Sequence, residues 1–332
     1  MERFIFFAAI VFAVIFGLGA MFSSGSLFNG AVHFDIDEDG RGTAAIVDTG
    51  AARLDPTTLE GTELRLKHLA AVVTITPEDR SDFVIEIDNP GGTPMPTVSS
   101  ESGRVIVDGQ LRGRIRGCRD DGGANLRGYE DVGVEQLPRI TIRAPRAVTA
   151  RRDGAGSTAI AAADSVDLDF SGCGAATIAD VTGALDLEVA GSGRIAAGAA
   201  RRLNADVAGS GEVSAGAIAE RADVDLAGSG TVTIASLTGS LSADAAGSGN
   251  VIVQGGAITT ADVDLAGSGD VDIAAPIQVL NVAIVGSGDV DVTAAVGDVD
   301  ADIAGSGGVN VQSVTGAVRK EVWGSGDVHV GP

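Results

Sequence analysis

The sequence is poor in the side chains that build metal centres, disulfide scaffolds and aromatic binding sites. Its 332 residues include three histidines, two cysteines, one tryptophan and one tyrosine. The histidines His33, His68 and His329 are scattered and show no metal-ligand spacing. Two cysteines allow at most one disulfide, which excludes a small fold held together by several bridges but suits an exported protein.

Basic residues are scarce in the second half of the chain. From Gly154 onward there are 6 Lys and Arg residues against 23 Asp and Glu residues, a net charge of −17. Because phosphate contacts need a basic surface, we expect no nucleic-acid partner. Between Arg104 and Arg152 the balance reverses, with 11 Arg against 6 acidic residues. This basic stretch is either a solvated loop or a surface that lies against an acidic face of the same chain or of a neighbour.

Glycine, by contrast, is abundant, and much of it lies in one repeat. From Gly154 a Gly-Ser-Gly tripeptide or a close variant recurs every 18 to 20 residues. The positions two places before and four places after its first glycine are apolar and alternate with polar residues, which is typical of strands with one buried face. A repeat of this period indicates units that stack on one another. The first glycines are Gly154, Gly172, Gly191, Gly209, Gly228, Gly247, Gly267, Gly286, Gly305 and Gly324.

The repeat predicts an all-β fold, a right-handed parallel β-helix. Each unit of ~19 residues carries two clear strands and a shorter apolar patch, such as Ile277 and Val279, so we expect a three-sided solenoid. Glycine suits the corners because it tolerates positive φ, and parallel crossovers are right-handed by strong preference. A propeller is the alternative, but its blades need about 40 residues, and a sandwich does not require a recurring tripeptide. We expect Trp323 to cover the open end of the core.

The N-terminus is strongly apolar. Residues Phe4 to Phe22 carry no charge and would span about 28 Å as a helix, close to the thickness of a bilayer core. The sequence therefore predicts an N-terminal hydrophobic helix in residues 1–22, either an uncleaved membrane anchor or a cleaved signal peptide. Arg3 and the free amino terminus favour an N-terminus on the inside and export of the rest of the chain.

Residues 23–61 are predicted to form a polar connector, and residues 62–332 a β-helical head. Within the head we expect irregular first layers over 62–153, because a first layer must cap the core, and regular repeats over 154–330.

One segment of the irregular layers stands out. Arg112 to Pro138 is rich in Gly and Arg without periodicity, which predicts a protruding loop. Cys118 lies in this loop, and Cys173 takes the serine position of a turn. The two cysteines are a candidate disulfide that would pin the loop to the second repeat.

The stacked motif also resembles a known family. AGSGDVDI at Ala266–Ile273 and VGSGDVDV at Val285–Val292 recur after alternating strands, behind an irregular lead and an export segment. This pattern, over roughly residues 62–330, resembles the bacterial putative auto-transporter adhesin, head GIN domain family (DUF2807). The resemblance implies a right-handed β-helix exposed in the bacterial cell envelope, an adhesin-like role and no established catalytic residues. The first two turns, GAG and GCG, and the Arg-rich insert depart from the family's pattern.

Acidic side chains form the most distinctive candidate site. They stand three and five places before the first glycine of successive repeats, with apolar residues between them, so both sets should point outward. The resulting carboxylate grid, about 4.8 Å by 6.8 Å, suits Ca²⁺ or Mg²⁺. The alternative is a solvated acidic face screened by ordinary salt. The candidate cation ligands are Asp206, Asp225, Asp244, Asp264, Asp223 and Asp262.

The residue patterns favour a non-enzymatic protein. The serines of the turns have no histidine recurring beside them, and similar carboxylate pairs occur in every repeat, so none stands out as an active site. After Gly154 only Phe170 and Trp323 are aromatic, which weighs against tight carbohydrate binding.

We therefore expect an exported envelope protein whose β-helical head has an adhesive or surface-structural role. The alternatives are a periplasmic, membrane-anchored binding or signalling module and a carbohydrate-active β-helix enzyme. The expected partners are the membrane, through the N-terminal segment, and an envelope or surface partner that the sequence does not name. Oligomers are compatible with such an array, and no cofactor is expected apart from the candidate Ca²⁺.

Overall fold

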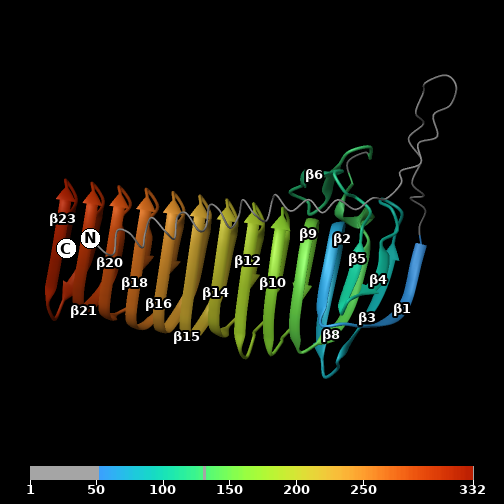
Figure 1. Ribbon diagram of the computed structural model, residues 1–332, viewed down its shortest axis with the longest axis horizontal. Helices are drawn as coiled ribbons and strands as arrows, with labels where there is room; N and C mark the ends of the chain where they lie inside the picture. Colours follow the sequence, from blue (N-terminus) through green and yellow to red (C-terminus); the bar gives the residue numbers. More distant parts are fainter. Residues whose placement is uncertain (1–51, 130–131, 332) are drawn as a thin grey trace, which may run out of the picture. The chain divides into compact units, whose positions relative to one another are not determined.

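The computed structural model describes residues 52–129 and 132–331. Their chain winds into a β-solenoid of about 10 turns with about 19 residues each, and successive turns lie side by side along one axis (Figure 1). This confirms the all-β solenoid that the repeat predicts, while its right-handed sense stays a prediction. The hydrophobic helix predicted in residues 1–22 lies outside the described residues. Among the residues that are described, no helix is long and apolar enough to cross a membrane.

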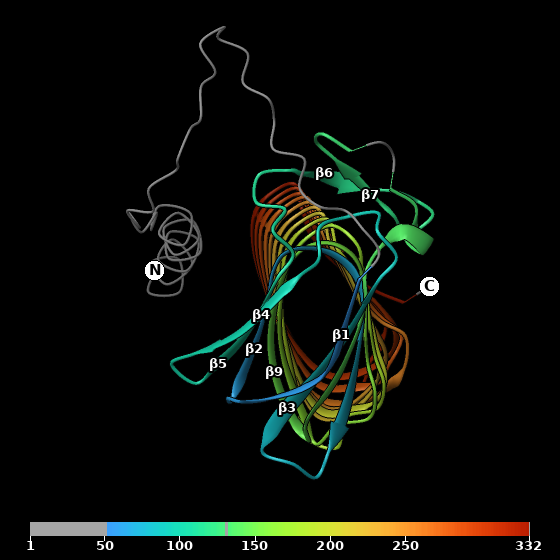
Figure 2. The same ribbon diagram turned by 90° about the vertical axis from the view of Figure 1, so that its right-hand side faces the viewer.

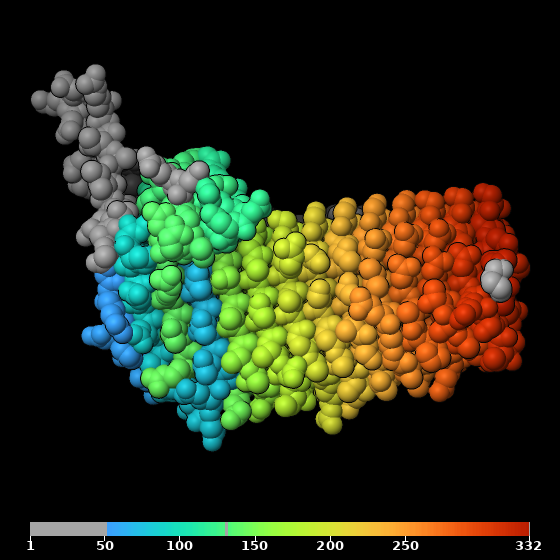
Figure 3. Space-filling model, turned by 180° about the vertical axis from the view of Figure 1, so that it is seen from behind, coloured from blue at the N-terminus to red at the C-terminus, as the bar shows by residue number. Residues whose placement is uncertain are grey.

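The regular part of the solenoid runs from β9 to β24, and strands at equivalent places in neighbouring turns pair in parallel. The space-filling view from behind shows the turns as successive bands (Figure 3). The strands are β9 (Ala147–Ile160), β10 (Ser165–Gly172), β11 (Ala175–Ile178), β12 (Ala184–Gly191), β13 (Arg194–Ala197), β14 (Ala200–Gly209), β15 (Glu212–Gly228), β16 (Thr231–Gly247), β17 (Asn250–Val253), β18 (Gly256–Gly267), β19 (Val271–Ile273), β20 (Ile277–Gly286), β21 (Val290–Gly305), β22 (Gly308–Val314), β23 (Val318–Gly324) and β24 (Asp327–Val330).

The register between neighbouring turns follows the glycine corners. Gly228 at the end of β15 pairs with Gly247 at the end of β16. The pairing of these two strands falls into three segments of β15, at 212–215, 217–218 and 221–228, with interruptions where the chain bends. The longest segment, 221–228, ends at the glycine corner. Its equivalents on the other turns form a continuous sheet, and one face of this sheet is exposed to solvent.

The core fills the inside of the solenoid with columns of apolar side chains. The positions two places before and four places after the first glycines are buried, as the sequence predicts, for example Val207 and Val213, except that Val322 before the last corner is only partly buried. The third apolar patch is only partly as expected: Ile277 is buried, but Val279 is 37% exposed and Leu280 faces inward instead. Because the pairing is interrupted between Ile277 and Val279, simple alternation fails in this segment.

The first glycine of each corner adopts a backbone conformation that other residues rarely take. At Gly267 the φ angle is 140°. The carbonyl oxygen of Gly247 on the preceding turn accepts the backbone N–H of Ser268 at 2.8 Å. A Cβ atom on Gly267 would lie 2.1 Å from that same oxygen. Glycine is therefore required both by the positive φ and by the close approach of the neighbouring turn, which explains why the tripeptide recurs.

Antiparallel strands cover the N-terminal end of the solenoid (Figure 2). β3 pairs antiparallel with β1 and β8, and β4 with β5, while β2 pairs in parallel with β5, β8 and β9. Residues 52–60, which the sequence assigns to the polar connector, form β1. The strands of this end are β1 (Ala52–Glu60), β2 (Glu63–Glu78), β3 (Asp82–Asn89), β4 (Thr97–Glu101), β5 (Arg104–Asp108) and β8 (Arg139–Pro145).

The segment predicted as a protruding loop does lie outside the stack, but parts of it are regular (Figures 1 and 2). β6 and β7 form a two-stranded antiparallel sheet, and a short 3-10 helix follows. These elements are β6 (Ile115–Cys118), β7 (Ala124–Leu126) and η1 (Val134–Gln136). A small apolar cluster of its own, including Leu111 and Leu137, packs beneath this insert.

A disulfide ties the insert to the second corner of the solenoid. It joins Cys118 at the end of β6 to Cys173, with their Cα atoms 5.7 Å apart. Cys173 lies between two glycines with positive φ, Gly172 and Gly174, so the side chain leaves the stack at a corner. This explains why cysteine stands here in place of the serine that later corners carry.

The last turn shows that one prediction about the end of the core is wrong. Trp323 on β23 is 58% exposed. It pairs with Ala304 next to the corner, whereas the preceding residue, Val322, pairs with buried Ile303 and packs against the core. Since successive side chains of a strand point to opposite faces, Trp323 points outward and does not cover the core.

Candidate functional site

Two columns of acidic side chains run along the outer side of the long strands, and we call this surface the acidic face. On each strand the neighbours of these side chains are buried, for example Val224 and Leu226 on either side of Asp225. The first column consists of Asp169, Glu188, Asp206, Asp225, Asp244 and Asp264, paired in register on successive turns. The second column consists of Asp167, Asp186, Asn204, Asp223, Ser242 and Asp262 in the same register.

Burial and neighbouring charges raise the pKa of three carboxyl groups in the first column, Glu188, Asp206 and Asp244. Burial, a hydrogen bond with Asp225 and the charges of Asp225 and Glu188 together raise the pKa of Asp206 to about 6. Burial also raises the pKa of Asp244 to about 7, with contributions from Asp264 and Asp225. Asp244 can therefore keep its proton near neutral pH and share it in a hydrogen bond with Asp264 on the next turn.

The second column relieves the same repulsion through its composition. Asn281 continues this column and donates from Nδ2 to Asp262 Oδ1 at 2.7 Å. Asp223 forms an ion pair with Arg221 on its own strand, with 2.5 Å between Nη2 and Oδ1. Ser242 lies between Asp223 and Asp262 in the register. Amide, hydroxyl and guanidinium groups thus replace carboxylate neighbours on these turns. Toward the N-terminal end Asp167 still pairs with Asp186, and burial and the charges of Asp169 and Asp186 raise the pKa of Asp167.

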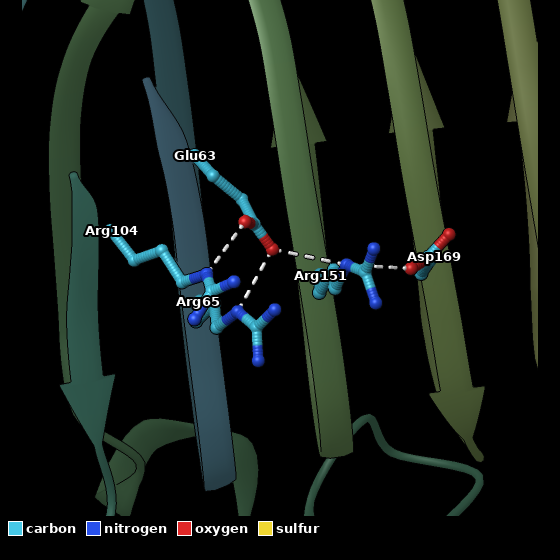
Figure 4. A network of polar contacts seen from close by, with 5 residues as sticks. All are labelled: Glu63, Arg65, Arg104, Arg151 and Asp169. Carbon is cyan, nitrogen blue, oxygen red and sulfur yellow. Dashed lines mark hydrogen bonds and ion pairs between the residues drawn. The ribbon is translucent and has the colours of Figure 1, made fainter. Parts of the chain in front are cut away.

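A network of arginines borders the acidic face toward the N-terminal end (Figure 4). Arg65 on β2 pairs with Arg151 on β9, and Arg151 pairs with Asp169 on β10. Arg151 Nε lies 2.9 Å from Asp169 Oδ2 and 3.0 Å from Glu63 Oε1. Arg65 Nε and Arg104 Nε donate to the Glu63 carboxylate at 2.8 and 3.1 Å. Burial of Glu63 opposes its ionisation, but the hydrogen bonds and charges of the arginines outweigh it and lower its pKa.

This network shows where part of the basic stretch goes. Arg104 and Arg151 belong to the stretch with excess arginine, and both bind carboxylates at the border of the acidic face. Arg104 and Arg151 therefore lie against an acidic face of the same chain. This is one of the arrangements that the sequence left open, and the other was a solvated loop. The signal for it was present in the sequence, because Arg151 stands three places before Gly154, where later repeats carry an acid.

The structure brings four of the six candidate cation ligands into one column. Asp206, Asp225, Asp244 and Asp264 lie on successive turns. The other two, Asp223 and Asp262, lie two turns apart in the second column and already have Arg221 and Asn281 as partners. In the part of the chain that the structure describes, no three His, Cys, Asp or Glu side chains form a group that could hold a metal ion. Cation binding by the acidic face stays a prediction.

Sequence reasoning missed a buried arginine beneath this border. Arg152 on β9 is 2% exposed and occupies the core position that Phe170 takes on the next turn. Its guanidinium lies 5.5 Å from the Phe170 ring centroid and donates to Ala155 O at 2.6 Å, to Ala71 O at 3.2 Å and to Thr158 Oγ1. Burial lowers the pKa of Arg152 to about 10, so the side chain stays charged at neutral pH.

Comparison with known proteins finds a family model that matches the middle of the chain. Residues 105–257 match the family model described as putative auto-transporter adhesin, head GIN domain (DUF2807). The predicted resemblance to this family is confirmed over these residues. The DUF2807 match begins in β5, includes the insert and the first regular turns, and ends in β18. It supports a non-enzymatic, adhesin-like role and gives no support to the carbohydrate-active enzyme.

Similar solved structures carry related descriptions. A "putative adhesin" from Parabacteroides merdae ATCC 43184 is 14% identical, with 85% of this chain and 96% of that chain covered and a TM-score of 0.38. A "putative adhesin" from Parabacteroides distasonis ATCC 8503 is 14% identical, with coverages of 86% and 99% and a TM-score of 0.40. A "putative lipid binding protein" from the same organism is 16% identical, with coverages of 83% and 96% and a TM-score of 0.37. No curated protein matches this chain.

Proposed function

We propose that this chain is a non-enzymatic protein of the bacterial envelope whose solenoid presents the acidic face for adhesion or surface structure. The acidic face carries the proposal, because carboxylates in the first column repeat in register over successive turns from Asp169 to Asp264. Such a surface offers many weak, identical contacts, and multivalent contacts of this kind add up to strong attachment. The family match over residues 105–257 supports the same role.

The chemistry of the face suits a surface that carries cationic groups. Attraction between an extended row of carboxylates and such a surface acts at long range and weakens with salt. Replacing carboxylates of the first column should therefore weaken attachment, and added salt should weaken it too. The hydrophobic residues 1–22, as a membrane anchor or export signal, would supply the location that this role requires.

Attachment of cells that carry the full chain to an amine-coated surface tests the proposal. The test variant is Asp206→Asn with Asp225→Asn in the first column. The control is Glu212→Gln with Glu220→Gln, which removes the same charge from β15 outside the acidic face, where the two carboxylates pair with Arg194 and Arg201. We expect several-fold weaker attachment for the first variant and wild-type attachment for the control. Equal attachment of all three proteins would contradict the proposal.

Location separates adhesion from a periplasmic binding or signalling module. Added protease should degrade the head in intact cells if it is displayed on the outer surface. Protection in intact cells, with degradation only after the outer membrane is opened, would favour the periplasmic module. A glycan-degradation screen with the purified full chain provides the corresponding check on enzymatic activity, and we expect no product.

A further inference from the structure

The last turn of the solenoid carries a lysine at a position that faces the core in every preceding regular turn. Lys320 on β23 pairs with Ala301, which is fully buried, and Ala301 in turn pairs with the buried Val282. Lys320 thus lies in a core column, where the side chains of earlier turns are apolar. A charged side chain in such a position is costly as soon as another layer covers it.

The ammonium group of Lys320 is held at the edge of this turn. Its Nζ lies 3.1 Å from Asp327 Oδ1 on β24, and the two side chains are 49% and 73% exposed. The ion pair therefore joins the long strand of the last turn to the strand that follows the corner. The last turn therefore carries a positive charge on a strand position that faces the core in earlier turns.

The other core-facing positions of β23 and β24 are valines, and the outer edges of these strands lack a strand partner within the described residues. Val318 and Val330 are 44% and 43% exposed, although both pair with core-facing positions of the turn before, Val299 and Val311. β23 pairs with β21 and β24 with β22, and no strand of residues 52–129 or 132–331 pairs with their other edges. Unpaired strand edges beside apolar side chains are a template for another chain.

A second copy of this chain could pair with these strand edges in only one arrangement. The N-terminal end is covered by the antiparallel strands β1, β3 and β4, so the copies would have to meet with their last turns facing each other. Such a contact has two-fold symmetry and closes after two copies. It would also bring the two Lys320 ammonium groups into the same desolvated contact, where like charges repel strongly.

We infer that Lys320 keeps the last turn closed to a second copy of this chain, and that removing its charge opens an end-to-end, two-fold contact. The ammonium of Lys320 supplies the repulsion, and the valines around it supply the apolar surface that docking would bury. The inference is independent of the acidic face and of adhesion, because it concerns the end of the stack. It applies equally to a further turn added to the stack, which would meet the same ammonium group.

Comparison of Lys320→Met with Arg319→Met in the purified full chain tests the inference. Both substitutions remove one positive charge from β23, but residue 319 pairs with outward-facing Asp300 and residue 320 with buried Ala301. We expect light scattering to show twice the wild-type mass for Lys320→Met and the wild-type mass for Arg319→Met. Spin labels placed at Ser325, beside the last turn, should show intermolecular coupling in Lys320→Met, whereas labels at Ser192 near the second corner should not.

The inference is overturned if Lys320→Met keeps the wild-type mass, if Arg319→Met gains mass to the same extent, or if assembly grows beyond two copies. Lys320→Ala is a second variant that removes the aliphatic part of the side chain as well as the charge. If Lys320→Met loses the strand signal in circular dichroism, the mass of Lys320→Ala tests whether removal of the charge allows dimer formation. Asp327→Asn breaks the ion pair but leaves the ammonium in place. It should therefore keep the wild-type mass.

Discussion

Asp244 lies directly opposite Asp264 in the register of two neighbouring turns, with both carboxyl groups on the outer side of the solenoid. Parallel strands are about 4.8 Å apart, so two full charges at this spacing repel each other, and more strongly where burial removes water. The pKa of Asp244 is raised to about 7, first by burial and then by the charges of Asp264 and Asp225. The acidic face therefore couples the stability of the stack to pH.

The first prediction is that the folded protein becomes more stable as the pH falls from about 8 to about 5. The pKa values of Asp206 and Asp244 in the folded state, about 6 and about 7, lie above the ordinary value of 3.8. Their contribution to stability is fully present below the ordinary pKa and is lost as the pH rises through the folded value. We expect a gain of about 1–2 kcal/mol for this partly solvated face, measured by urea unfolding at each pH.

Asp244→Asn should flatten this pH dependence and stabilise the protein at pH 8. An amide removes the repulsion and can still donate to its neighbour, as Asn281 does to Asp262. The matched control is Asp300→Asn, because Asp300 lies between Asn281 and Arg319 in its column and has no carboxylate neighbour there. A wild-type slope between pH 5 and 8 in Asp244→Asn would contradict this explanation.

The second prediction concerns divalent cations on the first column. If Ca²⁺ binds between Asp206, Asp225, Asp244 and Asp264, the melting temperature of the full chain should rise by several degrees in millimolar Ca²⁺ relative to chelator. The rise should be larger at pH 8 than at pH 5, since protons and cations compete for the same oxygens. Magnesium and matched ionic strength with NaCl are the controls. An identical melting temperature with Ca²⁺ and with chelator would rule the site out.

The alternation of apolar and polar residues was sufficient to predict the solenoid, its core columns and its acidic face. Residues such as Val207 and Val213 were assigned to the core because period-two alternation and the glycine register both place them there. The same counting put Asp206 and Asp225 on the outer face. Successive residues of a strand face opposite sides of the sheet, so the number of residues from the corner glycine decides which side a residue faces. This number can be counted in the sequence wherever the corners are regular.

The errors and omissions come from residues whose type does not fit their column. Arg152 stands two places before Gly154 and Lys320 four places before Gly324, both of them core-facing places, yet a charged residue there breaks the apolar pattern by which a core is recognised. Trp323 stands where other repeats carry a small residue before the corner, which suggested a cover for the core, but it lies on the outward-facing side of β23. Val279 was misplaced because the pairing skips a residue between Ile277 and Val279, and such an interruption has no composition signal.

The third prediction tests the corner glycines. Gly267→Ala should cost about 3 kcal/mol or more, because its φ of 140° is unfavourable for alanine and the new Cβ would lie 2.1 Å from Gly247 O. Gly255→Ala is the matched control, since the nearest atom to its Cβ would be Ala235 O at 3.8 Å. We expect the control to cost less than about 1 kcal/mol in urea unfolding. Equal losses in the two variants would show that close approach of the turns is not the cause.

The fourth prediction concerns the disulfide between Cys118 and Cys173, which closes a separation of 55 residues. Replacing both cysteines by serine should lower the free energy of unfolding by about 2–4 kcal/mol. The first effect should be local, because the insert has only a small apolar cluster of its own. Limited proteolysis should cut the double variant within residues 112–138 and leave the wild type intact there, with the stack from β12 onward protected in both. Cleavage at the same rate in both proteins would show that the small cluster alone holds the insert.

The fifth prediction concerns the buried charge of Arg152. Its guanidinium satisfies the carbonyl oxygens of Ala71 and Ala155 and lies over the Phe170 ring. Methionine would fill a similar volume but leave both buried carbonyls without this donor, at a cost of about 1–3 kcal/mol for each unsatisfied group. We therefore expect Arg152→Met to unfold at clearly lower urea concentration than the wild type.

Arg151→Met is the control for this variant, because the neighbouring Arg151 side chain is 57% exposed and forms surface ion pairs with Glu63 and Asp169. Such pairs contribute about 0–1 kcal/mol each, so the control should lose much less stability. Arg152→Lys separates charge from geometry, since an ammonium keeps the charge but cannot reproduce the planar set of donors. We expect it to be destabilised like the methionine variant. An Arg152→Met protein more stable than the wild type would instead show that desolvation of the charge outweighs its hydrogen bonds.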